Sequence, residues 1–116
     1  MNATHVENEV WGELWISLAS LLRSYTALHG MIASKQVTVE QDEHRILVRC
    51  GTNWLELERN GAVIQGRRAD GRNGTMEFTE TGRLRSGLNV EEEQGEEEMD
   101  MTAESWARDL MQELPR

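Results

Sequence analysis

The side chains that most often carry catalysis or bind metals are sparse in this sequence. The three histidines, His5, His29 and His44, do not have the spacings of zinc sites. The single cysteine, Cys50, falls on the apolar side of an alternating segment, whereas a catalytic thiol needs a nearby base and an electropositive setting. We therefore interpret Cys50 as a buried structural thiol, and the sequence predicts no catalytic residues, no metal site and no cofactor.

Two pairs of carboxylates have the spacing of groups that could share a face. Glu9 and Glu13 are one helical turn apart, and Glu56 and Glu58 alternate along a predicted strand. General acid–base catalysis needs surroundings that push the two pKa values apart, usually by partial burial. Both pairs are expected on solvated faces, so we predict that the chain is not an enzyme.

A glycine-rich stretch with three arginines is the best candidate for an anion contact. Residues 66–74 contain three arginines, Arg67, Arg68 and Arg72, and three glycines, Gly66, Gly71 and Gly74. Loops that bind the phosphates of nucleotides lead into a helix, but this stretch leads into a predicted strand. We favour a mobile hairpin loop. The alternative is contact with a small anion, an acidic peptide or the chain's own acidic tail.

Four tryptophans are many for a chain of 116 residues. Trp11 and Trp15 lie one turn apart on the apolar side of a predicted helix, where core packing is expected. Trp54 has the same parity as Glu56 and Glu58, which places it on the solvated face of a predicted sheet. Because tryptophan is enriched at interface hot spots, Trp54 is the best single candidate for an exposed binding residue.

A long amphipathic helix is predicted at the start of the chain, from about residue 6 to residue 32. Its apolar residues recur at intervals of three and four, which is helical periodicity. Such a helix is roughly 40 Å long, whereas a five-stranded sheet is roughly 24 Å wide. The apolar stripe is therefore longer than one sheet covers. Diagonal packing, the C-terminal helix or a second copy of the chain would cover the excess.

Short alternating segments follow the helix and predict an antiparallel sheet. Apolar residues alternate with polar ones from Ile46 to Cys50, at Leu55 and Leu57, and at Met76 and Phe78, as in a sheet with one solvated face. The turns between these segments are short, which leaves no room for crossover helices. We predict a β-meander of five or six strands, with Leu84 in the sixth. Asn60-Gly61 predicts a type I′ hairpin turn.

The charge of the chain is unevenly distributed. Residues 1–90 contain 10 basic and 11 acidic side chains, a net charge of −1, whereas residues 91–116 contain 2 basic and 10 acidic, a net charge of −8. A polyanionic segment repels phosphate backbones and anionic lipids, so neither direct nucleic-acid binding nor a membrane partner is expected. A single cysteine and the lack of a signal-peptide pattern favour a cytoplasmic protein.

The chain is divided by these patterns into an α+β domain over residues 1–88, an acidic linker over residues 89–100 and an amphipathic helix over residues 101–116. Thr102 is a candidate N-cap for this last helix. An isolated helix of this length is marginal in water, so we expect it to dock on its own domain or on a partner. Its candidate interaction residues are Trp106, Leu110, Met111 and Leu114.

The order of a long helix, a meander and a terminal helix in a small acidic chain resembles the bacterial type III secretion chaperones and related dimeric folds. This resemblance implies a dimeric protein that binds other proteins. The chain departs from the family between its third and fourth predicted strands. There the family has a helix, whereas this sequence has the tight-turn residues Asn60-Gly61.

Three functions are consistent with these patterns. The preferred hypothesis is a non-enzymatic protein-interaction module, a chaperone-like or adaptor homodimer with a further protein partner. The first alternative is a domain that binds a small anionic ligand through the arginine-rich stretch 66–74. The second alternative is an acidic mimic of nucleic acid that occupies the binding site of a basic partner.

Overall fold

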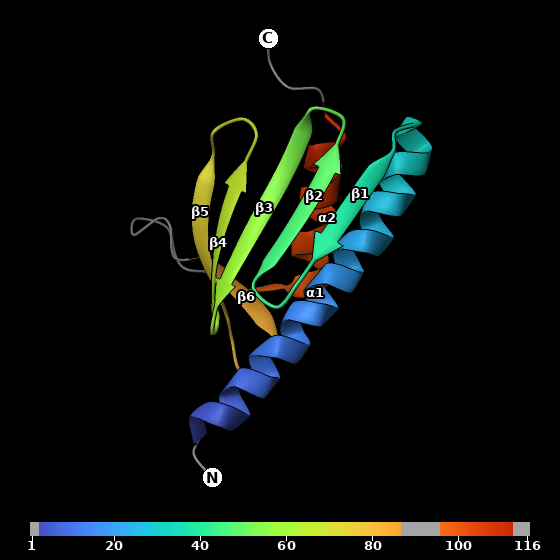
Figure 1. The fold of residues 1–116 in the computed structure, drawn as a ribbon. Coiled ribbons are helices and arrows are strands. Elements are labelled where there is room, and N and C mark those ends of the chain that lie inside the picture. Colours follow the sequence, from blue (N-terminus) through green and yellow to red (C-terminus); the bar gives the residue numbers. More distant parts are fainter. Residues whose placement is uncertain (1–2, 87–95, 113–116) are drawn as a thin grey trace.

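The chain folds as an α+β domain with an antiparallel sheet and a helix at each end (Figure 1). The computed structural model describes the backbone of residues 3–86 and 96–112, and the side chains of residues 9–85 and 96–112. Within these ranges the elements are α1 (Ala3–Ala33), β1 (Val37–Gln41), β2 (Arg45–Cys50), β3 (Asn53–Asn60), β4 (Val63–Arg68), β5 (Asn73–Phe78), β6 (Arg83–Ser86), β7 (Glu96–Glu98) and α2 (Met99–Leu110).

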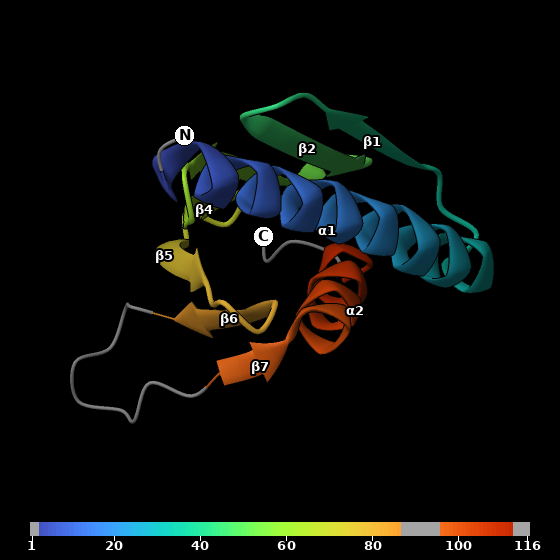
Figure 2. The ribbon, with the colours of Figure 1, turned by 90° about the horizontal axis from the view of Figure 1, so that it is seen from below.

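The sheet is a continuous meander in which each strand pairs with the next along the chain. It curls from β1 and β2, through β4 and β5, to β6 and β7, and both helices lie on the concave side (Figure 2). The predicted α+β class and the antiparallel meander are therefore confirmed. The alternating segments form the strands because each presents one apolar face to the helices and one polar face to solvent.

The sheet has seven strands in the described residues, so the prediction of five or six was wrong. The additional strand, β7, comes from the predicted acidic linker. Three glutamates pair with β6, so that Glu98 lies opposite Arg83 and Glu96 lies opposite Arg85. Opposite charges on directly facing residues stabilise such pairing, which outweighs the weak strand propensity of glutamate. The rest of the predicted linker, residues 89–95, lies outside the described residues.

Helix α1 ends three residues beyond Gly30, at Ala33. Ser34 adopts a positive φ of 56° and closes the helix in a Schellman motif, in which Lys35 N–H donates to the Gly30 carbonyl. Gly30 has another role. A Cβ atom there would lie 2.8 Å from the Lys35 carbonyl oxygen and 3.3 Å from Val37 Cγ2. The glycine therefore allows the chain to turn closely back against the helix and enter β1.

The β3–β4 hairpin confirms the predicted position of the turn but not its type. Asn60 pairs with Val63, which leaves Gly61 and Ala62 as the two loop residues. Gly61 has a φ of +64°, whereas Asn60 and Ala62 have negative φ values. A positive φ at the first loop residue alone is typical of a type II′ turn rather than the predicted type I′. The tight hairpin also separates this chain from the resembled chaperone family.

The hydrophobic core lies between the concave face of the sheet and the two helices. Helix α1 contributes residues at helical intervals, and the strands contribute alternate residues. The fully buried large side chains of the core include Trp15, Leu18, Leu22, Ile46, Val48, Leu57 and Ile64. Trp15 also donates its indole N–H to the Asp42 carbonyl at 2.8 Å, which ties the middle of α1 to the β1–β2 turn. Most of the apolar residues that predicted α1 therefore lie on its buried side, whereas Leu28 and Ile32 of the same stripe are exposed.

Helix α2 begins at Met99, so Thr102 is not its N-cap. The residue before the helix is Glu98, which makes no capping hydrogen bond with its side chain. The Thr102 hydroxyl lies inside the first turn, within 2.6 Å of Glu97 Oε1 and 3.3 Å of the Glu98 carbonyl oxygen. Strand β7 leads directly into the helix, so the chain direction and the start of α2 are set by the β6–β7 pairing.

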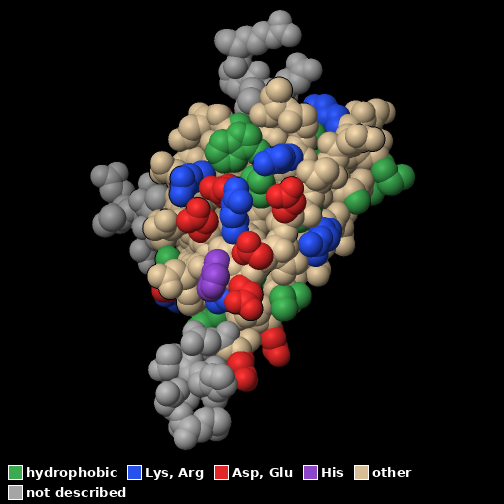
Figure 3. Space-filling view, viewed as in Figure 1, with side chains coloured by type: hydrophobic (Ala, Val, Ile, Leu, Met, Phe, Trp, Pro, Cys, Tyr) green, Lys and Arg blue, Asp and Glu red, His purple; other side chains and the backbone are tan. Residues whose placement is uncertain are grey.

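The convex face of the sheet carries alternating positive and negative side chains (Figure 3). Arg45 Nε donates to Glu56 Oε2 at 2.8 Å, and Arg67 Nη2 lies 3.3 Å from Glu58 Oε1. These exposed pairs join β2, β3 and β4 across the ladder. Each contributes little free energy because water screens it, but together they keep this face polar.

Candidate functional site

The arginine-rich stretch 66–74 is mostly strand rather than loop. Gly66, Arg67 and Arg68 belong to β4, Asn73 and Gly74 belong to β5, and the turn comprises residues 69–72. Because side chains alternate along a strand, the stretch sends its arginines to opposite faces. Arg67 lies on the convex face beside Glu58, whereas Arg68 and Arg72 line a groove on the concave face. The structure therefore brings together two of the three predicted arginines.

The groove lies between α2 and the concave face of the sheet, over the strands that α1 does not cover. Its volume is about 380 Å³. A smaller hollow of about 170 Å³ continues it toward the end of α2 and shares Leu55, Arg68, Arg72 and Trp106 with it. The groove is lined by Leu55, Leu57, Gly66, Arg68, Arg72, Asn73, Gly74, Met76, Leu84, Glu97, Thr102 and Trp106.

The hollow floor of the groove results from a pair of glycines. Gly66 of β4 lies directly opposite Gly74 of β5, and directly opposite residues point to the same face of a sheet. A Cβ atom at Gly66 would meet Leu57 Cδ2 at 3.3 Å and Met76 Cε at 3.8 Å, so this position faces the core. Because neither glycine has a side chain, the concave face of β4 and β5 is left open at these two neighbouring positions.

The two ends of the groove carry different groups: two arginines that are each paired with an aspartate at one end, and the carboxylate of Glu97 at the other. At one end Arg68 Nη1 lies 3.0 Å from Asp109 Oδ2 of α2, and Arg72 Nε lies 3.1 Å from Asp70 Oδ2. The Arg72 side chain is 75% exposed, so most of its guanidinium group is open to solvent. At the other end the Glu97 carboxylate is hydrogen-bonded to Thr102. An apolar floor thus runs between a guanidinium end and a carboxylate end.

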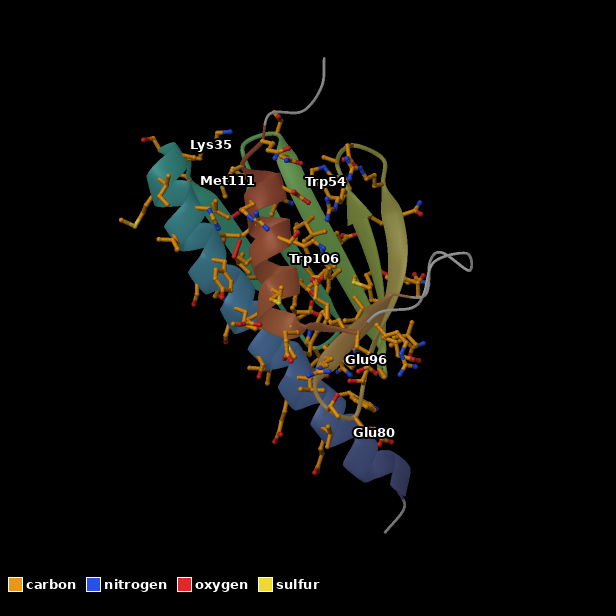
Figure 4. All side chains as sticks on the ribbon, turned by 180° about the vertical axis from the view of Figure 1, so that it is seen from behind. Lys35, Trp54, Glu80, Glu96, Trp106 and Met111 are labelled. Carbon is orange, nitrogen blue, oxygen red and sulfur yellow. The ribbon has the colours of Figure 1, made fainter. Side chains whose placement is uncertain are left out.

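Helix α2 packs on its own chain in the described structure. Trp106 and Leu110 are 8% and 5% exposed, and Trp106 forms a wall of the groove (Figure 4). The end of the helix is held by donors to its last carbonyl groups: Lys35 Nζ bonds to Met111 O at 2.7 Å, and Asn53 Nδ2 bonds to Leu110 O at 3.2 Å. These bonds satisfy backbone acceptors that a helix end leaves open.

Met111 and Cys50 meet at the end of α2. The Cys50 thiol is buried and lies 3.8 Å from Met111 Sδ. This position matches the interpretation of Cys50 as a structural thiol. The apolar stripe of α2 is therefore occupied by the chain's own core up to Met111, and the last predicted interaction residue, Leu114, lies outside the described residues.

Trp54 lies on the convex face of the sheet, where its parity predicted it. The register places it directly opposite Arg49 and on the same face as Glu56. Its side chain is half-buried, and its carbonyl oxygen accepts a hydrogen bond from Ala69 N–H at 3.2 Å. Trp54 does not line the main groove, but it contributes to the smaller hollow that continues it, together with Arg68 and Arg72.

A second surface runs along the solvent side of α1 and includes Leu28 and Ile32, two residues of the predicted apolar stripe. We call it the outer strip, and it comprises Ile16, Ser17, Ser20, Ser24, Ala27, Leu28, Met31 and Ile32, all exposed. Met31 and Ile32 are 80% and 75% exposed. Between Ile16 and Ile32 the sequence has one Asp, Glu, Lys or Arg, which is Arg23, and its guanidinium group donates to Gln41 of β1.

The described part of the acidic tail is folded against basic residues. Arg83 Nη2 lies 2.9 Å from Glu98 Oε1, and Arg85 Nη2 lies 3.0 Å from Glu96 Oε1. These carboxylates already have cationic neighbours, which lowers the negative potential that a nucleic-acid mimic would need. Residues 91–95, which carry further glutamates, lie outside the described residues.

Among the described side chains, those of residues 9–85 and 96–112, there is no group of three or more His, Cys, Asp or Glu that could hold a metal ion. No helix in the same ranges combines the length and apolar character needed to cross a bilayer. Comparisons of the chain with protein-family models, with curated proteins and with solved structures find no match.

Proposed function

We propose that this protein is a non-enzymatic protein-interaction domain that forms a homodimer through the outer strip of α1. The observation that carries this proposal is the exposure of large apolar side chains at the C-terminal end of a helix surface that lacks acidic residues. Leu28, Met31 and Ile32 are 52%, 80% and 75% exposed and lie within two helical turns.

A solvent-facing helix surface usually carries charged residues along its length. Single exposed apolar residues need no explanation, but a continuous apolar surface on a helix is typical of an interaction site. In the C-terminal turns of α1, the side chains of Leu28, Met31 and Ile32 lie on the side of the helix that neither the sheet nor α2 covers in the described structure. Complete burial of one Leu, Met or Ile side chain stabilises a complex by roughly 1.5–3 kcal/mol.

A second copy of the chain fits this surface because the strip combines large and small residues. In an antiparallel pairing of two α1 helices about Ala27, Leu28 and Met31 of one copy would face the small side chains near Ser24 of the other. The ridges of each helix would then enter the grooves of its partner. Such a contact is two-fold symmetric, the commonest arrangement of homo-oligomers.

The charge distribution also favours this pairing. The acidic residues of α1, Glu7, Glu9 and Glu13, lie near the N-terminal end of its sequence. With two antiparallel helices paired about Ala27, these residues of each copy lie beyond the end of the other helix. Two chains that each carry a net charge of −9 can thus meet without bringing their acidic residues together.

Sedimentation velocity of the full chain over a range of concentrations tests the proposal. We expect a dimer for the natural sequence, and a monomer for the double variant Leu28→Glu/Met31→Glu, because both positions are exposed in the monomer and apposed in the dimer. Met101→Glu is the matched control. It places the same charge on an exposed methionine, 61% accessible, on the other helix, and this variant should remain dimeric.

Two outcomes would overturn the homodimer. One is a natural chain that stays monomeric up to about 100 μM, a concentration at which an association of roughly 5.5 kcal/mol would be half complete. The other is a dimer that the Leu28→Glu/Met31→Glu variant leaves unchanged, since the dimer would then use a different surface. Circular dichroism of each variant confirms that the monomer remains folded.

A further inference from the structure

We propose that the groove beside α2 binds an organic carboxylate with an apolar body, whose carboxylate lies at the Arg68 and Arg72 end. This site is independent of the outer strip, because it lies on the opposite side of α2 and is lined by the sheet. The structure supports the proposal through the shape of the groove, its apolar floor and the charge at its arginine end.

The shape comes from the glycine pair in the sheet. Gly66 and Gly74 lie opposite each other on the concave face, and the floor around them is formed by Leu57, Met76 and Leu84. The groove volume of about 380 Å³ lies within the range of small-molecule sites. An apolar chain or an aromatic ring would occupy the place of the missing side chains and bury the exposed parts of Met76 and Trp106.

The charge at one end determines the polar group of the ligand. Asp109 pairs with Nη1 of Arg68, and Asp70 pairs with Nε of Arg72. Each guanidinium group has five N–H donors, so both retain donors for a further acceptor. A planar carboxylate matches the geometry of these donors and would be held by charge-assisted hydrogen bonds.

The two flanking aspartates also hold the arginines in place. Asp109 fixes the partly buried Arg68 against α2, and Asp70 fixes Arg72 within its turn through both its carboxylate oxygens: Oδ1 accepts from Arg72 N–H at 2.9 Å. Because the donors are positioned before the ligand arrives, less side-chain entropy is lost on binding. At the opposite end Glu97 repels a second negative charge, so a monocarboxylate is favoured over a dicarboxylate.

Isothermal titration calorimetry of the full chain with octanoate tests the proposal, with octylamine and octanol as probes of the same length. We expect saturable binding of octanoate and much weaker binding of the amine and the alcohol. Arg72→Gln should weaken octanoate binding about tenfold through the lost charge-assisted bonds. Arg67→Gln is the matched control, since Arg67 neighbours Arg68 but lies on the convex face, and it should bind as the natural chain does.

Gly74→Val tests the shape of the groove separately from its charge. Gly74 does not have a positive φ, so valine can adopt its backbone conformation, and its side chain would fill the hollow. We expect this variant to lose octanoate binding while its circular dichroism spectrum is unchanged.

The proposal is overturned by any of three results: no saturable binding of octanoate at millimolar concentration, equal affinity for octanoate and octylamine, or unchanged binding in Gly74→Val. If Gly74→Val does not fold, the comparison of Arg72→Gln with Arg67→Gln and the octylamine titration decide the question. Sedimentation of the same variants shows whether the groove and the homodimer respond independently, as their separate positions predict.

Discussion

The outer strip of α1 and the groove beside α2 are both apolar surfaces, but they are constructed in opposite ways. On the outer strip, large side chains such as Met31 and Ile32 project from the uncovered side of a helix. In the groove, side chains are missing, because Gly66 and Gly74 leave the floor of the sheet uncovered.

The polar surroundings of the two surfaces differ as well. The outer strip lacks charged residues, whereas the groove has guanidinium groups at one end and a carboxylate at the other. A convex neutral surface suits a macromolecule, and a concave surface with a charged end suits a small molecule with a matching group. Five substitutions, apart from their controls, test how far the two surfaces depend on the same core.

The largest effect is expected from Leu57→Ala, because this residue supports both surfaces. Leu57 is completely buried in the core that α1 shares, and it also lies directly opposite Gly66 in the groove floor. Its truncation should lower the free energy of unfolding by about 2–5 kcal/mol, measured by urea denaturation. Val63→Ala, at a position that is 37% exposed, should change it by about 0.5 kcal/mol or less. A small effect of Leu57→Ala would show that the core does not support the groove floor.

The two glycines of the groove should respond differently to the same change. In Gly66→Ala the new methyl group lies 3.3 Å from the buried Leu57 side chain, so we expect a loss of about 1–3 kcal/mol from overpacking. Gly74→Ala should be neutral or stabilise the fold by about 0.4–1 kcal/mol, since alanine restricts the unfolded chain. Thermal and urea denaturation of the two variants measures this difference in stability. If both variants lose the same stability, both glycines are in close contact with core side chains.

A smaller effect is expected where the end of α2 is attached. Asn53 Nδ2 donates to the carbonyl groups of Leu110 and Gln112, at 3.2 and 3.4 Å. Asn53→Ala removes both bonds and should cost about 1 kcal/mol. It should also increase hydrogen exchange in the last turn of α2 while α1 is unaffected. Gln65→Ala, an exposed position on the convex face, is the control and should leave both helices unchanged.

The smallest effect is expected at the turn that supports α1. The pKa of Asp42 is lowered because its carboxylate accepts a hydrogen bond from His44 N–H and, to a smaller extent, one from Arg45 N–H. A carboxylate with a lower pKa in the folded state stabilises the fold above its unfolded pKa and loses that contribution as the pH falls. Asp42→Ala should therefore lower the melting temperature slightly at pH 7 and have no effect below about pH 3. If the melting temperatures of Asp42→Ala and the natural chain still differ in acid, the ionised carboxylate is not the cause of the difference.

The elements of the fold were predictable because they depend on local periodicity. Intervals of three and four residues predicted α1 nearly to its observed ends, and alternation predicted the strands up to β6. The exceptions depend on contacts between distant residues. Strand β7 exists because Glu96 and Glu98 meet Arg85 and Arg83, and no property of an isolated acidic run predicts that pairing.

The candidate sites were less predictable than the fold. Because side chains alternate between the two faces of a strand, a strand through residues 67 and 68 would have predicted that Arg67 and Arg68 lie on opposite faces. The sequence instead predicted a loop over residues 66–74, because glycine is rare inside strands. The role of Gly66 and Gly74 follows from their register, which joins two positions eight residues apart across a hairpin. That register is decided by the whole sheet and not by the glycines themselves.

The sequence by itself determined the class of the fold, the length and apolar side of α1 and the uneven charge of the chain, since each follows from residue type and spacing. The tertiary structure alone decided that α2 docks on its own chain, that the acidic segment adds a strand, and that two arginines and two glycines meet at one groove. These features arise from pairing and packing between segments far apart in the chain, where the gain in buried area and matched charge selects one arrangement among several that local patterns allow.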